Sequence, residues 1–107
     1  MKQENYIVVF ITAGSAEEAQ QISQKLLKQR QAACVNIVPG IDSRYWWQDK
    51  LEKAQESLLI VKTRESLLPD IIKSVKKIHR ASVPEIIALP IVGGNQDYLD
   101  WIDSEVA

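Results

Sequence analysis

The residues of this chain whose side chains could carry chemistry are few. Its 107 residues contain one histidine, His79, and one cysteine, Cys34. A structural zinc site takes four Cys or His ligands, and a copper site takes several sulfur or imidazole donors. One chain holds no such set, so a metal site would need several copies of His79, or His79 together with Glu85 from a neighbouring copy of the chain. The candidate metal ligands are therefore His79, Glu85 and Cys34.

Each of the two rare residues also has a structural interpretation. His79 follows an amphipathic segment, where an imidazolium would favourably cap the C-terminus of a helix. Cys34 lies between Ala33 and Val35 in an apolar segment. That position favours a buried thiol that packs as a small hydrophobic side chain, and no positively charged neighbour in the sequence favours an activated one. A structural role and a ligand role remain open for both residues.

Motifs of catalysis and of nucleic-acid binding are missing from the sequence. It has no glycine-rich phosphate loop, no nucleophile elbow and no paired acidic motif, and a single His without a nucleophile nearby in sequence forms no triad. Thirteen basic residues face fourteen acidic ones, for a net charge of -1, whereas nucleic-acid binders usually carry a basic excess. We therefore predict a protein that is not an enzyme and does not bind nucleic acid.

Cysteine content and hydropathy predict a soluble cytoplasmic protein. One cysteine excludes an intrachain disulfide and makes an oxidising compartment unnecessary. Lys2 and the apolar run 6–11 are faintly like a signal peptide, but that run is short and Glu4 lies where a basic segment is expected. No stretch approaches the roughly 20 apolar residues of a membrane span, so we predict no membrane contact. The length fits one domain over residues 1–107.

Hydrophobic periodicity predicts the elements that position these residues. β-Branched and aromatic runs predict strands over 6–12, 32–38 continuing extended through 43–48, 56–63 and 85–92. Apolar residues spaced by three and four predict helices over 15–30, 66–79 and 96–106. Ser15 and Glu18 have the form of a capping box, and Pro69 falls in a first helical turn. The order predicts an α+β, ferredoxin-like β-α-β-β-α-β sandwich with a long central hairpin and a short C-terminal helix.

The predicted sheet lacks cover on one side. Right-handed crossovers place the two connecting helices on the same face. A one-sided sheet normally alternates apolar and polar residues along each strand. In the second strand, however, Val35 and Ile37 lie on one face while Cys34 and Val38 lie on the other. A monomer rarely exposes an apolar patch of this kind. We therefore expect another copy of the chain to cover the open face.

Two further groups of residues are candidates for contacts between copies. The aromatic run near the hairpin tip is assigned to an interface between copies of the chain, because aromatic residues are enriched at interfaces: Tyr45, Trp46 and Trp47. Glu56 and Lys62 share one face of their strand, since side chains repeat every second residue. They either form an ion pair between subunits or line an intersubunit cleft, which is assigned to Glu56, Lys62, Tyr98 and Trp101.

Segments 32–40, 43–48, 56–63, 79–86 and 98–102, in this order and spacing, resemble the CutA family of divalent-cation tolerance proteins. The resemblance covers nearly the whole chain. It implies a ferredoxin-like fold, homotrimers built by strand pairing, and tolerance to copper and other divalent metals. The positions that carry a cysteine and the first histidine of a pair in relatives proposed to bind copper are Ile11 and Ile78 here. Ala81 stands in place of a tyrosine, and Asp49 in place of a turn glycine.

These observations together predict a homotrimer that binds Cu(II) or another divalent cation only weakly and has no other cofactor. An alternative is a small-ligand sensor, because nitrogen-regulatory signal transducers have a similar fold and bind nucleotides between subunits. RNA-recognition domains share the same element order, but their third strand carries stacking aromatic residues. The corresponding strand here, 57–63, contains no aromatic ring, which argues against RNA binding.

Overall fold

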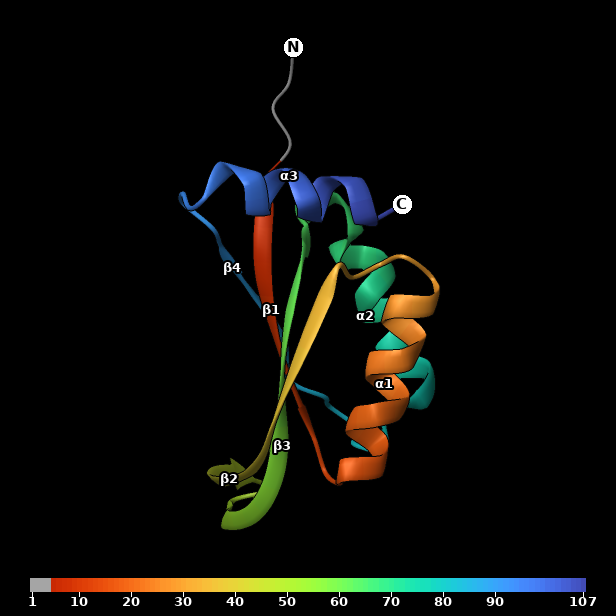
Figure 1. Cartoon of the computed structure of the whole chain (residues 1–107). Helices are drawn as coiled ribbons and strands as arrows, with labels where there is room; N and C mark the ends of the chain where they lie inside the picture. The colour runs from red at the N-terminus through yellow and green to blue at the C-terminus, as the bar shows by residue number, and fades with distance from the viewer. Residues whose placement is uncertain (1–4) are drawn as a thin grey trace.

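The computed structural model describes residues 5–107. Lys2 and Glu4, on which the signal-peptide interpretation depends, lie outside the described residues. One sheet has two helices on one side, and a third helix lies at the end of the sheet where the first strand begins (Figure 1). The elements are β1 (Tyr6–Ala13), α1 (Ala16–Lys28), β2 (Cys34–Trp47), β3 (Lys50–Arg64), a 3-10 turn (Glu65–Leu67), α2 (Leu68–Ile78), β4 (Ile86–Pro90) and α3 (Gln96–Glu105).

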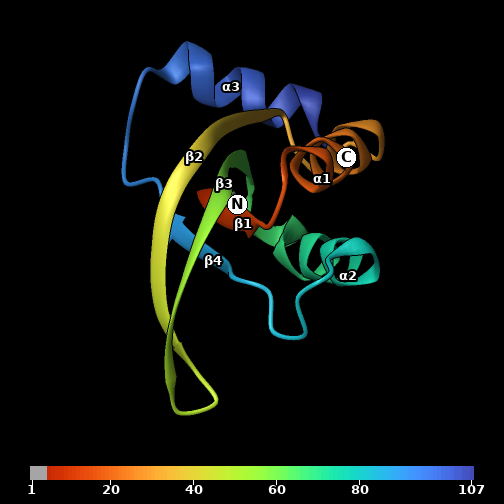
Figure 2. The ribbon, with the colours of Figure 1, turned by 90° about the horizontal axis from the view of Figure 1, so that it is seen from below.

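The sheet is antiparallel throughout, with strand order β2-β3-β1-β4. β1 lies in the centre, where Val9 pairs with Val61 of β3 and with Ala88 of β4. Seen from below, α1 and α2 lie side by side against the same face (Figure 2). The predicted α+β class and the β-α-β-β-α-β order are confirmed.

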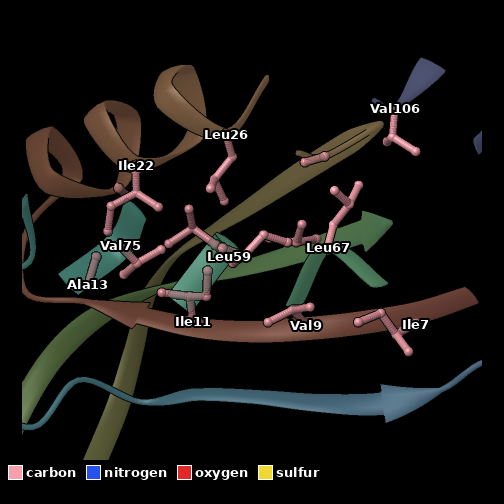
Figure 3. Close-up of a cluster of buried hydrophobic side chains, with 14 residues drawn as sticks. Ile7, Val9, Ile11, Ala13, Ile22, Leu26, Leu59, Leu67, Val75 and Val106 are labelled. Carbon is pink, nitrogen blue, oxygen red and sulfur yellow. The ribbon is translucent and has the colours of Figure 1, made fainter. Parts of the chain in front are cut away.

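The hydrophobic core fills the layer between this face of the sheet and the two helices (Figure 3). Alternate residues of β1 and β3 point into it, as the strand period of two requires. The side chains with at most 1% exposure include Val9, Ile11, Leu59, Val61, Ile22, Leu26, Ile71 and Val75. Each contributes about 1.5–3 kcal/mol by leaving water, so this layer supplies most of the stabilisation of the described chain.

The capping box of α1 forms with one change. The Ser15 hydroxyl accepts a hydrogen bond from the backbone N–H of Glu18 (3.1 Å). The Glu18 carboxylate reaches back past Ser15 and accepts from the N–H of Gly14 (2.8 Å). Its second oxygen accepts from the N–H of Arg80 (2.8 Å), beyond α2. Glu18 therefore joins the start of α1 to the segment after α2.

The long hairpin is more continuous than the sequence predicts. β2 runs through Pro39 and Gly40, where the predicted break is instead a register shift between Val38 and Ile41. Gly40 has a positive φ of 70°, which glycine adopts without steric cost. A two-residue turn of Gln48 (φ 50°) and Asp49 (φ 65°) connects β2 to β3, as in hairpins whose turn matches the twist of the strands.

The remaining boundaries differ by small amounts. The segment predicted as one helix over 66–79 begins with the 3-10 turn, and α2 carries Pro69 in its first turn as predicted. β4 ends at Pro90, two residues before the predicted end. No helix within residues 5–107 is both long enough and apolar enough to cross a membrane.

The face of the sheet away from α1 and α2 is apolar. The strand register places Cys34, Asn36 and Val38 on this face and Val35 and Ile37 on the other, as predicted. The apolar side chains of this open face are Val8, Phe10, Leu58, Ile60, Val38, Ile87 and Leu89. Within the single described chain Ile87 is 52% exposed and Leu89 44% exposed, so the open face lacks apolar cover there.

Candidate functional site

A cleft of about 710 Å³ lies between the hairpin and the loop that connects α2 to β4. Its volume falls in the range of small-molecule sites. The last residues of β2 form one wall, and the α2–β4 loop forms the other. The lining residues are Thr12, Ser43, Arg44, Tyr45, Trp46, Trp47, Glu56, His79, Ala81, Ser82, Val83, Pro84 and Glu85.

Two carboxylates of the cleft are unpaired within the described chain. Glu56 projects from β3 and Glu85 directly precedes β4, and neither forms an ion pair or a hydrogen bond with residues 5–107. The guanidinium of the lining, Arg44, contacts Asp42 at 3.2 Å, which balances its charge. The lining therefore carries an excess of negative charge, since His79 is neutral for the reason given below.

Three aromatic residues of the hairpin are among those that line the cleft. Tyr45 is 43% exposed, Trp46 72% and Trp47 41%. An indole with most of its surface in water leaves a large apolar area without a packing partner. These rings are therefore available to a ligand or to another chain.

His79 holds the α2–β4 loop against the end of β1. Its Nε2 lies 2.6 Å from the carbonyl oxygen of Thr12, and its Nδ1 accepts a hydrogen bond from the N–H of Ala81 (3.0 Å). An Nδ1 that accepts an N–H carries no proton, so the ring is neutral with its proton on Nε2. The side chain is only 4% exposed. Both ring nitrogens thus have partners, and a metal ion would have to displace one of them.

The Glu18 side chain also holds the α2–β4 loop in place. Burial raises the pKa of this carboxyl, but it accepts hydrogen bonds from the N–H groups of Gly14 and Arg80, which favour the ionised form, and its pKa is lowered overall. Its Oε1 lies 3.8 Å from Nε2 of His79. The carboxylate is therefore ionised at neutral pH and is committed to backbone donors.

Cys34 lies away from this cleft. It pairs with Lys62 on the open face, and Lys62 pairs with Val8, four residues along β1 from Thr12. Four strand residues span about 13 Å, so one chain brings His79 and Glu85 to one cleft and leaves Cys34 elsewhere. Among the described residues no three His, Cys, Asp or Glu side chains gather as a metal-binding group.

The residues assigned to an intersubunit cleft divide in the same way. Glu56 lines the cleft, whereas Lys62, Tyr98 and Trp101 lie at the Cys34 end of the open face. There the Lys62 ammonium contacts the Asn36 amide oxygen and lies 4.0 Å from the Cys34 sulfur. Burial raises the pKa of Tyr98, and its contact with Cys34 raises it further.

The two aromatic rings of α3 at this end lie against one another. The ring centroids of Tyr98 and Trp101 are 5.4 Å apart, with the planes tilted by 38°.

Sequence reasoning missed the part that Glu18 and Thr12 play in holding the cleft. The capping box predicted the role of Glu18 at the start of α1. It did not predict that Glu18 also accepts a hydrogen bond from the N–H of Arg80, which is distant in the sequence. Nothing in the sequence marked the carbonyl oxygen of Thr12.

The fold and the cleft define an α+β protein of the ferredoxin-like type with a pocket at the hairpin end of its sheet. The family model described as CutA1 divalent ion tolerance protein matches residues 7–105. The chain belongs to this CutA1 family.

Several known proteins are similar to this chain in both sequence and fold. A divalent-cation tolerance protein CutA of Thermus thermophilus is 50% identical over 95 residues, which cover 89% of this chain and 92% of that protein. Protein CutA 1, chloroplastic, of rice is 50% identical over 96 residues, which cover 90% of this chain but 54% of that protein. The chain thus spans about half the length of its plant relatives. The crystal structure of CutA1 from Oryza sativa superposes with a TM-score of 0.93 at 47% identity, covering 96% of this chain and 94% of that one.

Proposed function

We propose that this protein acts in tolerance to divalent cations as a homotrimer that binds copper only weakly. Membership of the CutA1 family supports the link to divalent cations. The single observation that carries the proposal of assembly is the open face of the sheet, where Ile87 and Leu89 are half exposed in one chain.

Packing physics supports assembly over that face. Its seven apolar side chains come from all four strands and form one continuous surface of the sheet. Covering them with a second copy gains about 25 cal/mol per Å² of apolar area removed from water. The free outer edge of β2, a strand of 14 residues, also offers unpaired backbone groups for strand addition. The family resemblance supplies the number of three copies.

The chemistry of the donors supports weak metal binding. In one chain the cleft offers the free carboxylates of Glu56 and Glu85, and His79 joins them only by giving up its bond to Thr12 or to Ala81. Breaking a buried hydrogen bond costs about 1–3 kcal/mol, which lowers the affinity for the ion. A protonated imidazole cannot ligate a metal ion, so copper binding through His79 requires the neutral ring.

Native mass spectrometry with and without Cu(II) tests both parts of the proposal. We expect a mass of three 12.1 kDa chains and partial occupancy by copper that disappears on dilution. A His79→Ala variant that remains trimeric should bind less copper, whereas Cys34→Ser should bind as the native protein does. A monomer at micromolar concentration contradicts the assembly. Full occupancy at stoichiometric copper contradicts the weak site.

A second candidate function, binding of a small ligand in the cleft, is favoured by one specific observation. The cleft combines three exposed aromatic rings with two unpaired carboxylates, which metal binding alone does not require.

A location in the cytoplasm and the lack of catalytic activity remain predictions from the sequence. Cell fractionation with an antibody tests the first. Relatives differ in this respect, since they include proteins named as chloroplastic and as periplasmic.

A further inference from the structure

We propose that the outer surface of α1 and α2 docks a short acidic segment of a partner protein. This inference goes beyond the proposed function, and it depends neither on copper nor on a ligand in the cleft. The lysine surface, as we call it, is defined by the five lysines of the two helices: Lys25, Lys28, Lys73, Lys76 and Lys77.

The lysines of the two helices have no charged partner within the described chain. None of the five ammonium groups forms an ion pair or a hydrogen bond with residues 5–107. The arginines differ, because Arg30, Arg44 and Arg64 each form an ion pair with a carboxylate. Most of the unpaired positive charge of the described chain therefore lies on α1 and α2.

The spacing of the lysines adds to this excess charge. Residues three or four apart are neighbours on a helix surface, and like charges at these spacings destabilise the helix. Lys76 and Lys77 occupy these positions relative to Lys73, and Lys28 follows Lys25 by three residues. The helix dipole favours positive charge in a last turn, but Lys73 lies in the middle of α2. A face that only meets solvent usually mixes both signs of charge, so the pattern favours a role in binding.

The packing of the two helices brings their lysines to one surface. α1 and α2 lie side by side (Figure 2), and the Ser74 hydroxyl donates to the side-chain oxygen of Gln29 at 3.3 Å. Lys25 lies about one turn before Gln29. Lys73 and Lys77 lie next to Ser74 and one turn after Lys73, respectively. The lysines of both helices therefore border the same helix–helix contact.

The lysine surface lies on the side of the sheet opposite the open face (Figure 1). An assembly formed over the open face leaves this side toward water. None of the residues assigned above to contacts between copies belongs to α1 or α2. The single chain exposes four of the lysines fully and Lys25 in part. A partner can therefore reach the lysine surface in the single chain and in such an assembly.

The composition of the two helices selects the kind of anion. Neither helix contains an aromatic ring, whereas single-stranded nucleic acids are held by stacking on such rings. The apolar stripes of both helices are buried in the core, so these stripes cannot insert into lipid as those of membrane-surface helices do.

The size and the net charge of the chain favour a short partner segment. A nucleic-acid duplex is a long polyanion, and the whole chain carries a net charge of -1 that does not attract it. The 11 residues of α2 span about 16 Å. An extended peptide covers this length with about five residues, so its carboxylates can meet the lysines without reaching the acidic parts of the chain.

Fluorescence anisotropy on the assembled protein tests the inference. The probe is a labelled peptide of about eight residues that alternates Glu and Ser, and its uncharged counterpart alternates Gln and Ser. We expect the Glu-Ser peptide to bind and the Gln-Ser peptide to bind at least about tenfold more weakly, because only carboxylates attract the ammonium groups. Raising the NaCl concentration from about 0.05 M to about 0.3 M should weaken binding at least about tenfold, because salt screens exposed charges.

Paired variants assign the binding to the lysine surface. Lys73→Gln combined with Lys77→Gln should weaken the Glu-Ser peptide about fivefold, since exposed ion pairs contribute modestly. The matched control is Lys50→Gln combined with Lys53→Gln, which removes the same charge from exposed positions of the hairpin. This control should leave the affinity unchanged. Thermal unfolding and light scattering on each variant verify that the fold and the assembly are retained.

Several results would overturn the inference. Equal effects of the two double variants would show a general attraction and not a docking surface. No change in anisotropy with the Glu-Ser peptide at low salt would show that no such surface exists. Tighter binding of duplex DNA or of phosphatidylserine vesicles than of the peptide would assign the surface to another class of partner. The assembled mass and copper occupancy are measured without the peptide, so failure of this inference is distinguishable from failure of the proposed function.

Discussion

Replacing Glu18 with glutamine removes one charge and one acceptor from a buried position, and its effect can be worked out from the structure. The two carboxylate oxygens accept from the N–H groups of Gly14 and Arg80, both at 2.8 Å, and the side chain is 4% exposed. Glutamine keeps one acceptor and turns an NH₂ group toward the other N–H. One hydrogen bond to a charged group is lost, which costs about 1.5–3 kcal/mol. We therefore expect Glu18→Gln to lower the free energy of unfolding by about 2 kcal/mol at pH 7.

The pH dependence gives this prediction a second test. The folded-state pKa of Glu18 is lowered, so its stabilisation is present above the unfolded pKa near 4.5 and is lost as the pH falls through the folded value. Urea unfolding at one protein concentration should show a difference between native and Glu18→Gln protein that is full at pH 7 and shrinks in acid. The matched control is Glu17→Gln, a neighbour exposed to solvent. Equal effects of the two variants, or a difference that persists unchanged in acid, would refute the reasoning.

Three further predictions concern the hairpin and the core. Asp49→Gly should raise stability by about 0.5–1 kcal/mol in thermal unfolding, because glycine accepts the φ of 65° without strain; no gain would show that this turn is unstrained. If Trp46 and Trp47 lie at an interface between copies, replacing both with alanine should weaken assembly by at least about 2 kcal/mol in sedimentation experiments. The control Lys53→Ala, at an exposed position, should leave assembly unchanged. Equal effects of the two changes would show that the tryptophans are not interface residues. Thr63→Val should cost about 1–3 kcal/mol, because the buried Thr63 hydroxyl donates to a carbonyl of the α1–β2 loop at 2.6 Å; a neutral result in denaturant titration would contradict a net contribution from that bond.

Periodicity in the sequence predicted the elements because it reports which side of each strand or helix meets a core. Ile7, Val9 and Ile11 alternate along β1 and all three are buried. The same signal failed at Pro39 and Gly40, where proline and glycine normally interrupt a strand. Here the pairing of Ile41 with Glu56 resumes beyond a register shift, so cross-strand bonds to β3 overrode the local preference.

The candidate site was less predictable than the fold, because its geometry depends on contacts between distant segments. The sequence identified His79 and Glu85 as members of one polar site, and both line the cleft. It grouped Cys34 with them, but strand register placed that residue on the open face. The partners of His79 are backbone atoms of Thr12 and Ala81. Backbone atoms carry no residue-type signal, so their part in the site emerges only from the folded chain.

The two-residue turn at Gln48 and Asp49 has a consequence for the order of folding. β2 and β3 are joined by the shortest connection in the sheet, and hairpins of this kind form in about 1–10 μs. β1 must then reach β3 across a segment that contains α1 and β2, and β4 must reach β1 across most of the chain. The cost of closing such loops is met before their contacts form. During that interval both faces of β3 are open to water, with Leu59 on one face and Ile60 on the other. The protein concentration during refolding therefore decides whether β1 of the same chain or a strand of another chain pairs with the hairpin first.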